Sequence, residues 1–102
     1  MSAFGTVIIE AMRLCILQIL AVAPEYACNS QILVDVLERH KGLHVTHDQV
    51  RAELAWLKQL GLITLIKLSP EISVATLTER GSDVGKGRAT IPGVERPIAG
   101  AS

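Results

Sequence analysis

The sequence lacks a net charge, which limits the partners that the whole molecule can attract. Ten lysines and arginines balance ten aspartates and glutamates, so the formal net charge at pH 7 is zero. The chain therefore has no overall electrostatic preference for phosphates or for membrane surfaces. Any affinity for nucleic acid must come from a local patch of positive charge.

Cysteines are few and catalytic patterns are missing. Cys15 and Cys28 are too few for a disulfide framework, and we expect both thiols to be free in a reducing compartment. No nucleophile, base and orienting acid recur at a plausible spacing, and one small core leaves few apolar residues to line a pocket. The chain is therefore not expected to be an enzyme or to need a cofactor.

Two ligand-binding patterns are incomplete. Three histidines together with Cys28 suggest a metal site, but His40 and His44 straddle Gly42, where a helix should end. The segment GSDVGKG, 81–87, falls one residue short of the phosphate-loop spacing and lacks the Ser or Thr that follows the lysine in such loops. We predict no metal ligand and no phosphate loop.

Apolar residues are abundant, and the longest apolar run is VIIEAMRLCILQILAVA, 7–23. This run is similar to an export signal or a membrane-spanning segment. However, Glu10 and Arg13 interrupt it, and it is shorter than the ~20 apolar residues that cross a bilayer. We therefore expect a cytoplasmic protein, with no membrane contact, whose first helix spans about 5–23 and ends before Pro24.

The first helix is apolar nearly all round, so it must be buried all round. A domain of 102 residues has room for only one core, and its other helices can cover only one face of this helix. A second copy of the chain is expected to cover the other face. The predicted dimer interface consists of Ile8, Met12, Ile16 and Ile19.

The segment 24–30 is expected to be a turn that ends in a helix cap, because Asn29 or Ser30 can accept a hydrogen bond from the first free amides of a helix. A second helix should follow and end at Gly42. Its buried face is predicted from the spacing of four apolar residues, Ile32, Leu33, Val36 and Leu37.

A third helix should begin at Thr46, because Thr46 and Gln49 have the spacing of a reciprocal capping box. Gly61 fits the left-handed position that ends a helix. The predicted inward stripe of this helix is Val50, Leu54 and Leu57. Two segments rich in β-branched residues follow, 62–68 and 72–77, and they predict a hairpin. Thr78 should cap a last short helix.

This order of elements is that of a winged helix-turn-helix domain. The predicted fold is mainly α with a small β-hairpin: a three-helix core, a two-stranded wing, a short C-terminal helix and an extended tail. Residues 1–88 are expected to form the domain. Residues 89–102 are expected to form an extended or flexible C-terminal tail, because 87–102 contains three glycines and two prolines. The chain shows no internal repeat and no second domain.

The chain resembles the small winged-helix proteins of Mu-like phages and prophages, which are similar to ArsR-type transcriptional regulators. The matching stretches cover nearly the whole chain and include RLCILQIL, DQVRAELAWLKQLGLITL and VATLTERGSDVGKGRATIPGVERP, of which GRATIPGVERP is the distinctive part. The resemblance implies a winged-helix fold and a dimer held partly by the first helix.

In a helix-turn-helix protein the third helix enters the major groove with its N-terminal residues near the bases. Arg51 is the one good base-reading side chain, since its fork can make two hydrogen bonds to guanine. Asp48 opposes binding, because a carboxylate at the leading edge of the helix repels the DNA backbone unless it pairs with a cytosine amine. Its alternative role is a favourable interaction with the dipole at the helix N-terminus. The predicted DNA-binding residues are His47, Asp48, Arg51, Ala52 and Lys58 on the helix and Lys67 on the wing.

Two functions remain open from the sequence. The first is a dimeric, phage-derived regulator of transcription that binds double-stranded DNA. The alternative is a winged helix reused as a protein-protein interaction module that contacts other phage proteins during assembly, without DNA binding. A DNA binder should gather its cations on one surface, namely Arg51, Lys58, Lys67, Lys86 and Arg88. Trp56 is expected to make a flanking contact within the protomer or across the dimer, not to stack on a base.

Overall fold

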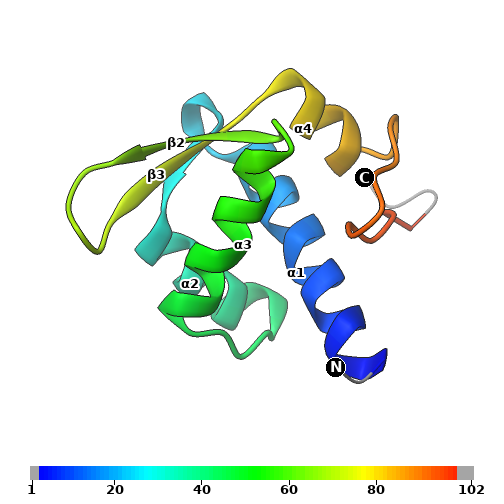
Figure 1. Cartoon of the computed structure of the whole chain (residues 1–102), viewed down its shortest axis with the longest axis horizontal. Coiled ribbons are helices and arrows are strands. Elements are labelled where there is room, and N and C mark those ends of the chain that lie inside the picture. The colour runs from blue at the N-terminus through cyan, green and yellow to red at the C-terminus, as the bar shows by residue number, and fades with distance from the viewer. Residues whose placement is uncertain (1–2, 99–102) are drawn as a thin grey trace.

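The computed structural model describes residues 3–98, and these are mainly helical with a small antiparallel sheet (Figure 1). The elements in order are α1 (Ala3–Val22), the 3-10 turn η1 (Pro24–Tyr26), β1 (Ala27–Asn29), α2 (Ser30–Lys41), α3 (His47–Gln59), β2 (Ile63–Lys67), β3 (Ser73–Leu77) and α4 (Glu79–Gly85). The predicted helices and the predicted hairpin are all present, with bounds that differ by a few residues.

α1 is the central helix, and α2, α3, α4 and β3 all pack against it. Its buried residues are Met12, Leu14, Ile16, Leu17, Ile19 and Leu20. By length and composition alone α1 is also apolar enough to cross a membrane. Six of its side chains are nevertheless buried inside the protein, as the core helix of a folded domain requires.

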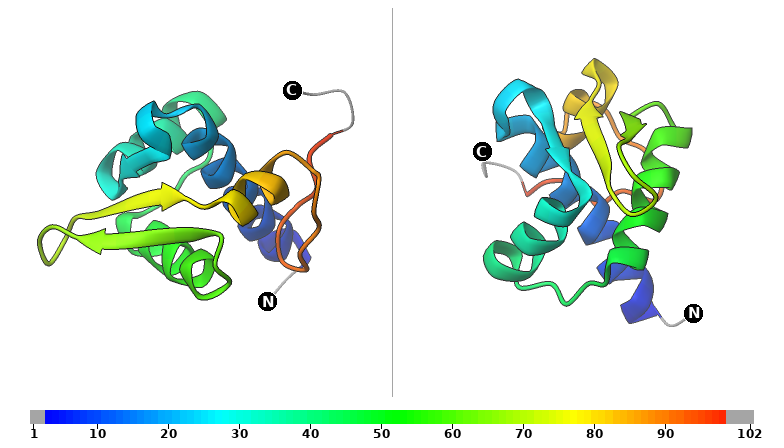
Figure 2. Two further views of the ribbon diagram at one scale, coloured as in Figure 1. Left: turned by 90° about the horizontal axis from the view of Figure 1, so that it is seen from above. Right: turned by 90° about the vertical axis from the view of Figure 1, so that its left-hand side faces the viewer.

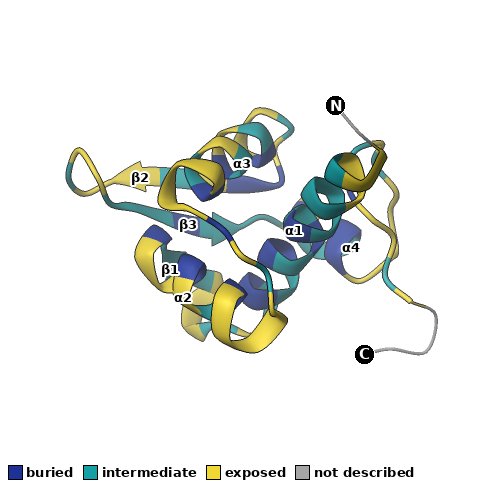
Figure 3. Cartoon of the chain, turned by 90° about the horizontal axis from the view of Figure 1, so that it is seen from below, coloured by how far each residue is buried: buried dark blue, intermediate teal, exposed yellow. Residues whose placement is uncertain are grey.

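This packing corrects the predicted dimer interface on α1. Met12, Ile16 and Ile19 are 3%, 0% and 8% exposed within a single protomer, so these side chains pack mainly into its own core, although Ile19 also borders an open groove beside α1. Ile8 is half-buried. Three other apolar residues of α1, Phe4, Val7 and Val22, are exposed. Figure 3 shows that the N-terminal end of α1 is more exposed than its middle. A helix apolar all round gives no periodic signal that says which face turns inward.

The sheet has three strands where the sequence predicted two. β1 pairs antiparallel with β3, with Cys28 opposite Ala75, and the strand order is β1-β3-β2. The segment 24–30 is therefore a 3-10 turn followed by a strand, and the prediction of a turn throughout was incomplete. A strand of three residues is too short to show an alternating pattern, and it exists because β3 offers it a free edge.

The helix ends follow the predicted caps closely. Asn29 accepts a hydrogen bond from the Ile32 amide at 2.8 Å, and Gly42 ends α2 in the left-handed region with φ 66°. Thr46 and Gln49 form the reciprocal capping box at the start of α3. The inward stripe of α3 is also confirmed, since Val50, Leu54 and Leu57 are all buried.

The buried face of α2 differs from the prediction by a small rotation. Leu33 and Leu37 are fully buried as expected, but Val34 takes the place predicted for Ile32, which is 50% exposed. Val36 is only half-buried. The i, i+4 pair Leu33 and Leu37 is shared by both faces, so the apolar pattern alone did not decide between them.

The described part of the C-terminal segment, 89–98, lies against the helices. The Glu95 amide donates to the Glu10 carbonyl at 3.3 Å, and Val94 is 6% exposed. Figure 2 shows this segment running alongside the N-terminal part of α1. The predicted division at residue 88 stays a prediction, and residues 99–102 of the predicted tail lie outside the described residues.

Candidate nucleic-acid interface

The residues predicted to read DNA do lie together on the outer face of α3. His47, Asp48, Ala52 and Lys58 are exposed, and the side chain of Arg51 keeps 40% of its surface open to solvent. The inward stripe of α3 fixes this orientation, because burial of Val50, Leu54 and Leu57 turns the other positions outward. The outer face of α3 is therefore open to solvent from His47 at its N-terminal end to Lys58 in its last turn.

The β2-β3 hairpin lies beside α3 and extends away from the body of the protein (Figure 2). β2 follows α3 after a tight turn in which the Leu62 amide donates to the Leu57 carbonyl at 3.0 Å. Lys67 is exposed at the outer end of β2. The hairpin can therefore reach a long partner at the same time as α3, which is how a wing contacts DNA outside the groove that the helix enters.

Arg51 is not free on this face, because its guanidinium pairs with the carboxylate of Asp48 three residues earlier. Residues three apart on a helix face each other, so this pair follows directly from their spacing. Asp48 is 85% exposed and also stands in the first turn of α3, where a negative charge interacts favourably with the helix dipole. The pair neutralises the leading edge of the candidate reading face.

The cations expected to gather on one surface are divided in the structure. Lys58 and Lys67 make no ion pair with any residue in the described range and belong to the α3 and wing side. Lys86 and Arg88 follow α4, at the opposite end of the molecule from the tip of the hairpin (Figure 1). Arg88 is also engaged with Asp83 at 3.5 Å. The candidate face thus carries only a modest local positive charge.

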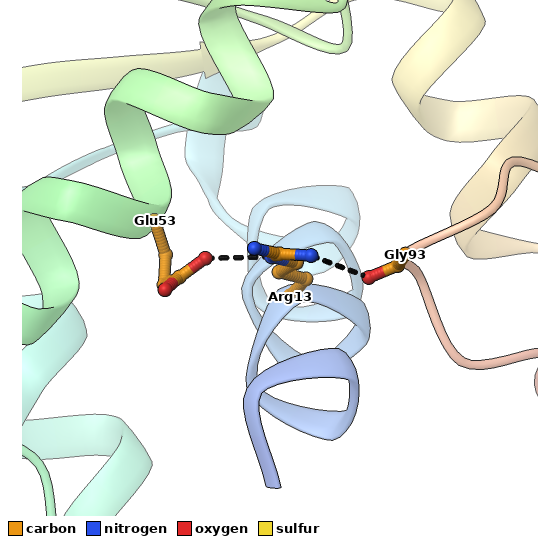
Figure 4. A network of polar contacts seen from close by, with 3 residues as sticks. All are labelled: Arg13, Glu53 and Gly93. Carbon is orange, nitrogen blue, oxygen red and sulfur yellow. Dashed lines mark hydrogen bonds and ion pairs between the residues drawn. The ribbon is translucent and has the colours of Figure 1, made fainter. Parts of the chain in front are cut away.

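Trp56 makes a contact within the protomer, on the side of α3 that faces α1. The Arg13 guanidinium lies 3.7 Å from the centroid of the Trp56 ring. Arg13 also donates from Nε to Oε1 of Glu53 at 2.6 Å and from Nη1 to the Gly93 carbonyl at 2.9 Å (Figure 4). One side chain of α1 therefore holds α3 and the C-terminal segment together.

The sequence predicts a flanking contact for Trp56 but does not predict the network that Arg13 forms with Trp56, Glu53 and Gly93. The available signal was Arg13 itself, a cation inside an almost wholly apolar helix. Such a residue is retained in a core only when charged and polar partners are brought to it. Its hydrogen-bond partners, Glu53 and Gly93, are 40 and 80 residues away in the chain, so no pattern of neighbouring residues predicts them.

The remaining candidate ligands do not assemble into a site. Cys15 and Cys28 are free thiols, and burial raises the pKa of both above the ordinary value, with Lys41 opposing the shift at Cys15 only in part. Both thiols are therefore protonated and weakly nucleophilic at neutral pH. His40, His44 and His47 are exposed, and no group of three metal-ligating side chains forms within residues 3–98.

Comparison with known proteins places the chain in a phage family. It is 41% identical over 91 residues to gp26 of Escherichia phage Mu, a match that covers 89% of this chain and 92% of the phage protein. The chain belongs to the family of phage Mu gp26. A protein of Haemophilus influenzae is 35% identical over 78 residues, covering 76% of this chain and 74% of that protein. No family model matches the chain.

Among solved structures, a chain in the complex structure of hsRosR-S1 has a similar fold. The two superpose with a TM-score of 0.60 at 24% sequence identity, and the match covers 81% of this chain and 64% of that chain. At this identity the likeness shows the fold alone. Together with the order of elements it fits a winged-helix-like fold for this member of the gp26 family.

Proposed function

We propose that this gp26-family protein is a winged helix-turn-helix protein, similar to ArsR-type regulators, that binds double-stranded DNA as a homodimer in the cytoplasm and regulates transcription. The observation that carries the proposal is the outward face of α3 beside the exposed hairpin. The DNA-binding residues of the proposal are those predicted, His47, Asp48, Arg51, Ala52, Lys58 and Lys67. The proposal includes no catalytic step and no cofactor.

The proposed mechanism is binding by occupancy. The N-terminal half of α3 enters the major groove, where Arg51 exchanges its bond to Asp48 for the edge of a guanine. Lys58 and Lys67 contact phosphates on either side. A dimer presents two such units, so the binding site has two halves that follow its two-fold symmetry, and its occupation blocks or recruits other proteins.

The proposal is tested by measuring binding to random-sequence duplex and to intergenic DNA of the phage across a salt series. We expect association at about 50 mM salt that weakens steeply as salt rises, because each phosphate contact releases counterions. Lys58→Ala and Lys67→Ala should each lower the salt slope by about one unit, while Arg51→Ala should weaken binding to the preferred sequence alone. Absence of binding at micromolar protein in low salt would rule the proposal out.

Asp48→Asn is expected to strengthen DNA binding about threefold to tenfold. The substitution removes a carboxylate that repels phosphates and releases Arg51 from its ion pair, while it keeps the size of the side chain. Affinity for duplex DNA at low salt is the measurement. Asp35→Asn is a matched control, because Asp35 forms a similar exposed pair with Arg39 on α2. Equal or weaker binding by Asp48→Asn would count against α3 as the DNA-contacting element.

A second function is favoured by the apolar character of the hairpin. Ile66 and Leu68 are 62% and 66% exposed near the tip of the hairpin. In a DNA-binding wing, cationic side chains at these positions would contact phosphates and strengthen binding. Exposed apolar side chains at a protruding element suit contact with a protein. The alternative proposal is therefore a protein-protein interaction module in phage assembly, and Ile66→Ser with Leu68→Ser should abolish that contact without altering DNA affinity.

A further inference from the structure

An open apolar groove runs beside the C-terminal half of α1, with a volume of about 1230 Å³. α1, η1, β1, α2 and the segment after α4 all contribute to its walls. The apolar lining includes Ile19, Val22, Ala27, Ile32 and Val36. Val22 is 84% exposed and Ile32 50% exposed, so the groove leaves large apolar side chains open to water. Such an apolar surface marks a place where a partner binds.

The size of the groove fits a helix better than a small ligand. Sites for small molecules usually have volumes of about 300–1,000 Å³. A helix about 10 Å across that rises 1.5 Å per residue occupies roughly 120 Å³ per residue, so the groove matches about ten residues or three turns. The occupant should therefore be a short amphipathic helix with an apolar face.

The protein carries such a helix at the other end of α1. The N-terminal turns of α1 project beyond the rest of the fold (Figure 1), and Phe4 and Val7 are 73% and 59% exposed there. At 3.6 residues per turn, the positions in an arc about 80° wide, which runs from Val7 through Phe4 to Cys15, form one stripe along the whole helix. This outer stripe of α1 consists of Phe4, Val7, Ala11, Cys15, Gln18 and Val22. Gln18 and Val22 are also part of the groove lining.

We infer that the groove receives the N-terminal half of α1 from a second copy of this chain, so that two α1 helices pair antiparallel through their outer stripes. A two-fold axis near the middle of α1 places Phe4 of each copy over Val22 of the other, and both grooves are filled at once. Such a self-complementary contact closes as a dimer. The small residues Ala11 and Cys15 meet at the centre and let the two helices approach closely.

The groove lining contains two lysines, Lys41 and Lys86, and one carboxylate, Glu25, so its net positive charge suits an occupant that brings a carboxylate. Lys86 lines the groove on the α4 side and makes no ion pair within the described part of the chain. Gly85, next to it, lies against Leu17. The antiparallel pairing sets Glu10 of the second copy opposite this region of α1. Glu10 likewise has no ion pair among residues 3–98. In the dimer, the Glu10 carboxylate of each copy can therefore pair with the Lys86 ammonium group of the other.

This inference rests on the homodimer of the proposed function and names its surface, which differs from the interface predicted from the sequence. The first test is the mass in solution at about 100 μM, measured by sedimentation equilibrium. We expect twice the chain mass of 11.0 kDa for the natural protein and a single chain mass for Val22→Glu and for Phe4→Glu. Ile66→Glu is the matched control, because Ile66 is similarly exposed but lies on the hairpin. It should remain a dimer.

Charge exchange tests the orientation of the pair. Glu10→Lys and Lys86→Glu should each weaken the dimer about tenfold, and the double variant should restore it, as expected for direct opposite charges. In a Cys28→Ser background, Ala11→Cys should become cross-linked to Cys15 of the second copy by a short bismaleimide. Circular dichroism confirms that each variant is folded.

A natural protein that sediments as a monomer, or Val22→Glu and Phe4→Glu variants that remain dimers, would overturn the inference. The DNA assay separates this outcome from failure of the proposed function. A dimer that depends on Val22 and Phe4 but binds no DNA leaves the interface standing and removes the DNA proposal. A protein that binds DNA but stays monomeric removes the interface and the homodimer of the proposed function, and it leaves only the DNA contact standing.

Discussion

Gly81→Ala is expected to lower the free energy of unfolding by about 3 kcal/mol, the upper part of the range for overpacking a tight interior. Gly81 lies in the first turn of α4 and is buried. A Cβ atom at this position would stand 2.0 Å from the Leu62 carbonyl oxygen and 2.8 Å from Cδ1 of Leu77. The leucine side chain can rotate away, but the carbonyl cannot, because it also accepts a hydrogen bond from the Thr78 amide.

The expected loss is large because α4 and the end of the hairpin must separate to admit one methyl group. Gly81 also donates from its amide to Oγ1 of Thr78 at 3.0 Å, the bond that caps α4. Domains of this kind have only about 5–15 kcal/mol of stability, so the variant should lose a large share of it. Urea unfolding followed by circular dichroism measures the difference.

Gly42→Ala is the control for Gly81→Ala. Gly42 has φ +66° and no atom within 4 Å of an added Cβ, so alanine there suffers only the left-handed backbone strain of about 1–2 kcal/mol. The two variants therefore separate backbone strain from steric overlap. If Gly81→Ala were no less stable than Gly42→Ala, the close packing of α4 against Leu62 would be wrong.

Arg13→Ala is expected to lower the free energy of unfolding by about 3 kcal/mol, the lower end of the effect of breaking a buried ion pair. The Arg13 and Glu53 side chains are only 15% and 13% exposed, so the substitution leaves a nearly buried carboxylate without its partner. It also removes the cation from the face of Trp56 and the donor from the Gly93 carbonyl. Three parts of the chain lose their common contact.

A double-mutant cycle with Glu53→Gln isolates the pair. Much of the loss in Arg13→Ala should disappear when Glu53 is already neutral, because no charge is then left buried. Arg39→Ala is the control, since the Arg39 and Asp35 side chains are 73% and 57% exposed and such pairs contribute about 0–1 kcal/mol. Equal effects of Arg13→Ala and Arg39→Ala would show that the network contributes no more than a surface pair.

The parts of the fold that the sequence predicted are those encoded by neighbouring residues. The capping box of Thr46 and Gln49, the left-handed Gly42 and the inward stripe of α3 each depend on spacings of a few residues. These signals also fix the rotation of α3, so the exposed position of Arg51 could be predicted. Its pairing with Asp48 follows from the same spacing and could have been predicted too.

The features that sequence reasoning missed depend on contacts between distant segments. β1 is defined by its pairing with β3, more than 40 residues later. The inward face of α1 is decided by which helices pack on it, because an all-round apolar helix offers several equivalent faces. The partners of Arg13, likewise, come from α3 and from the C-terminal segment. None of these has a periodic or local signature.

The third strand gives the hairpin a mechanical connection to the start of α2. β3 pairs with β1, β1 ends at Asn29, and Asn29 is the residue that caps α2. The Ser73 amide also donates to Oγ of Ser30, the first residue of α2, at 3.2 Å. A load applied to the hairpin by a bound partner is therefore transmitted through backbone hydrogen bonds into α2. The hairpin is therefore tied to α2 at its base, and we expect a partner that moves β3 to shift the first turn of α2 as well.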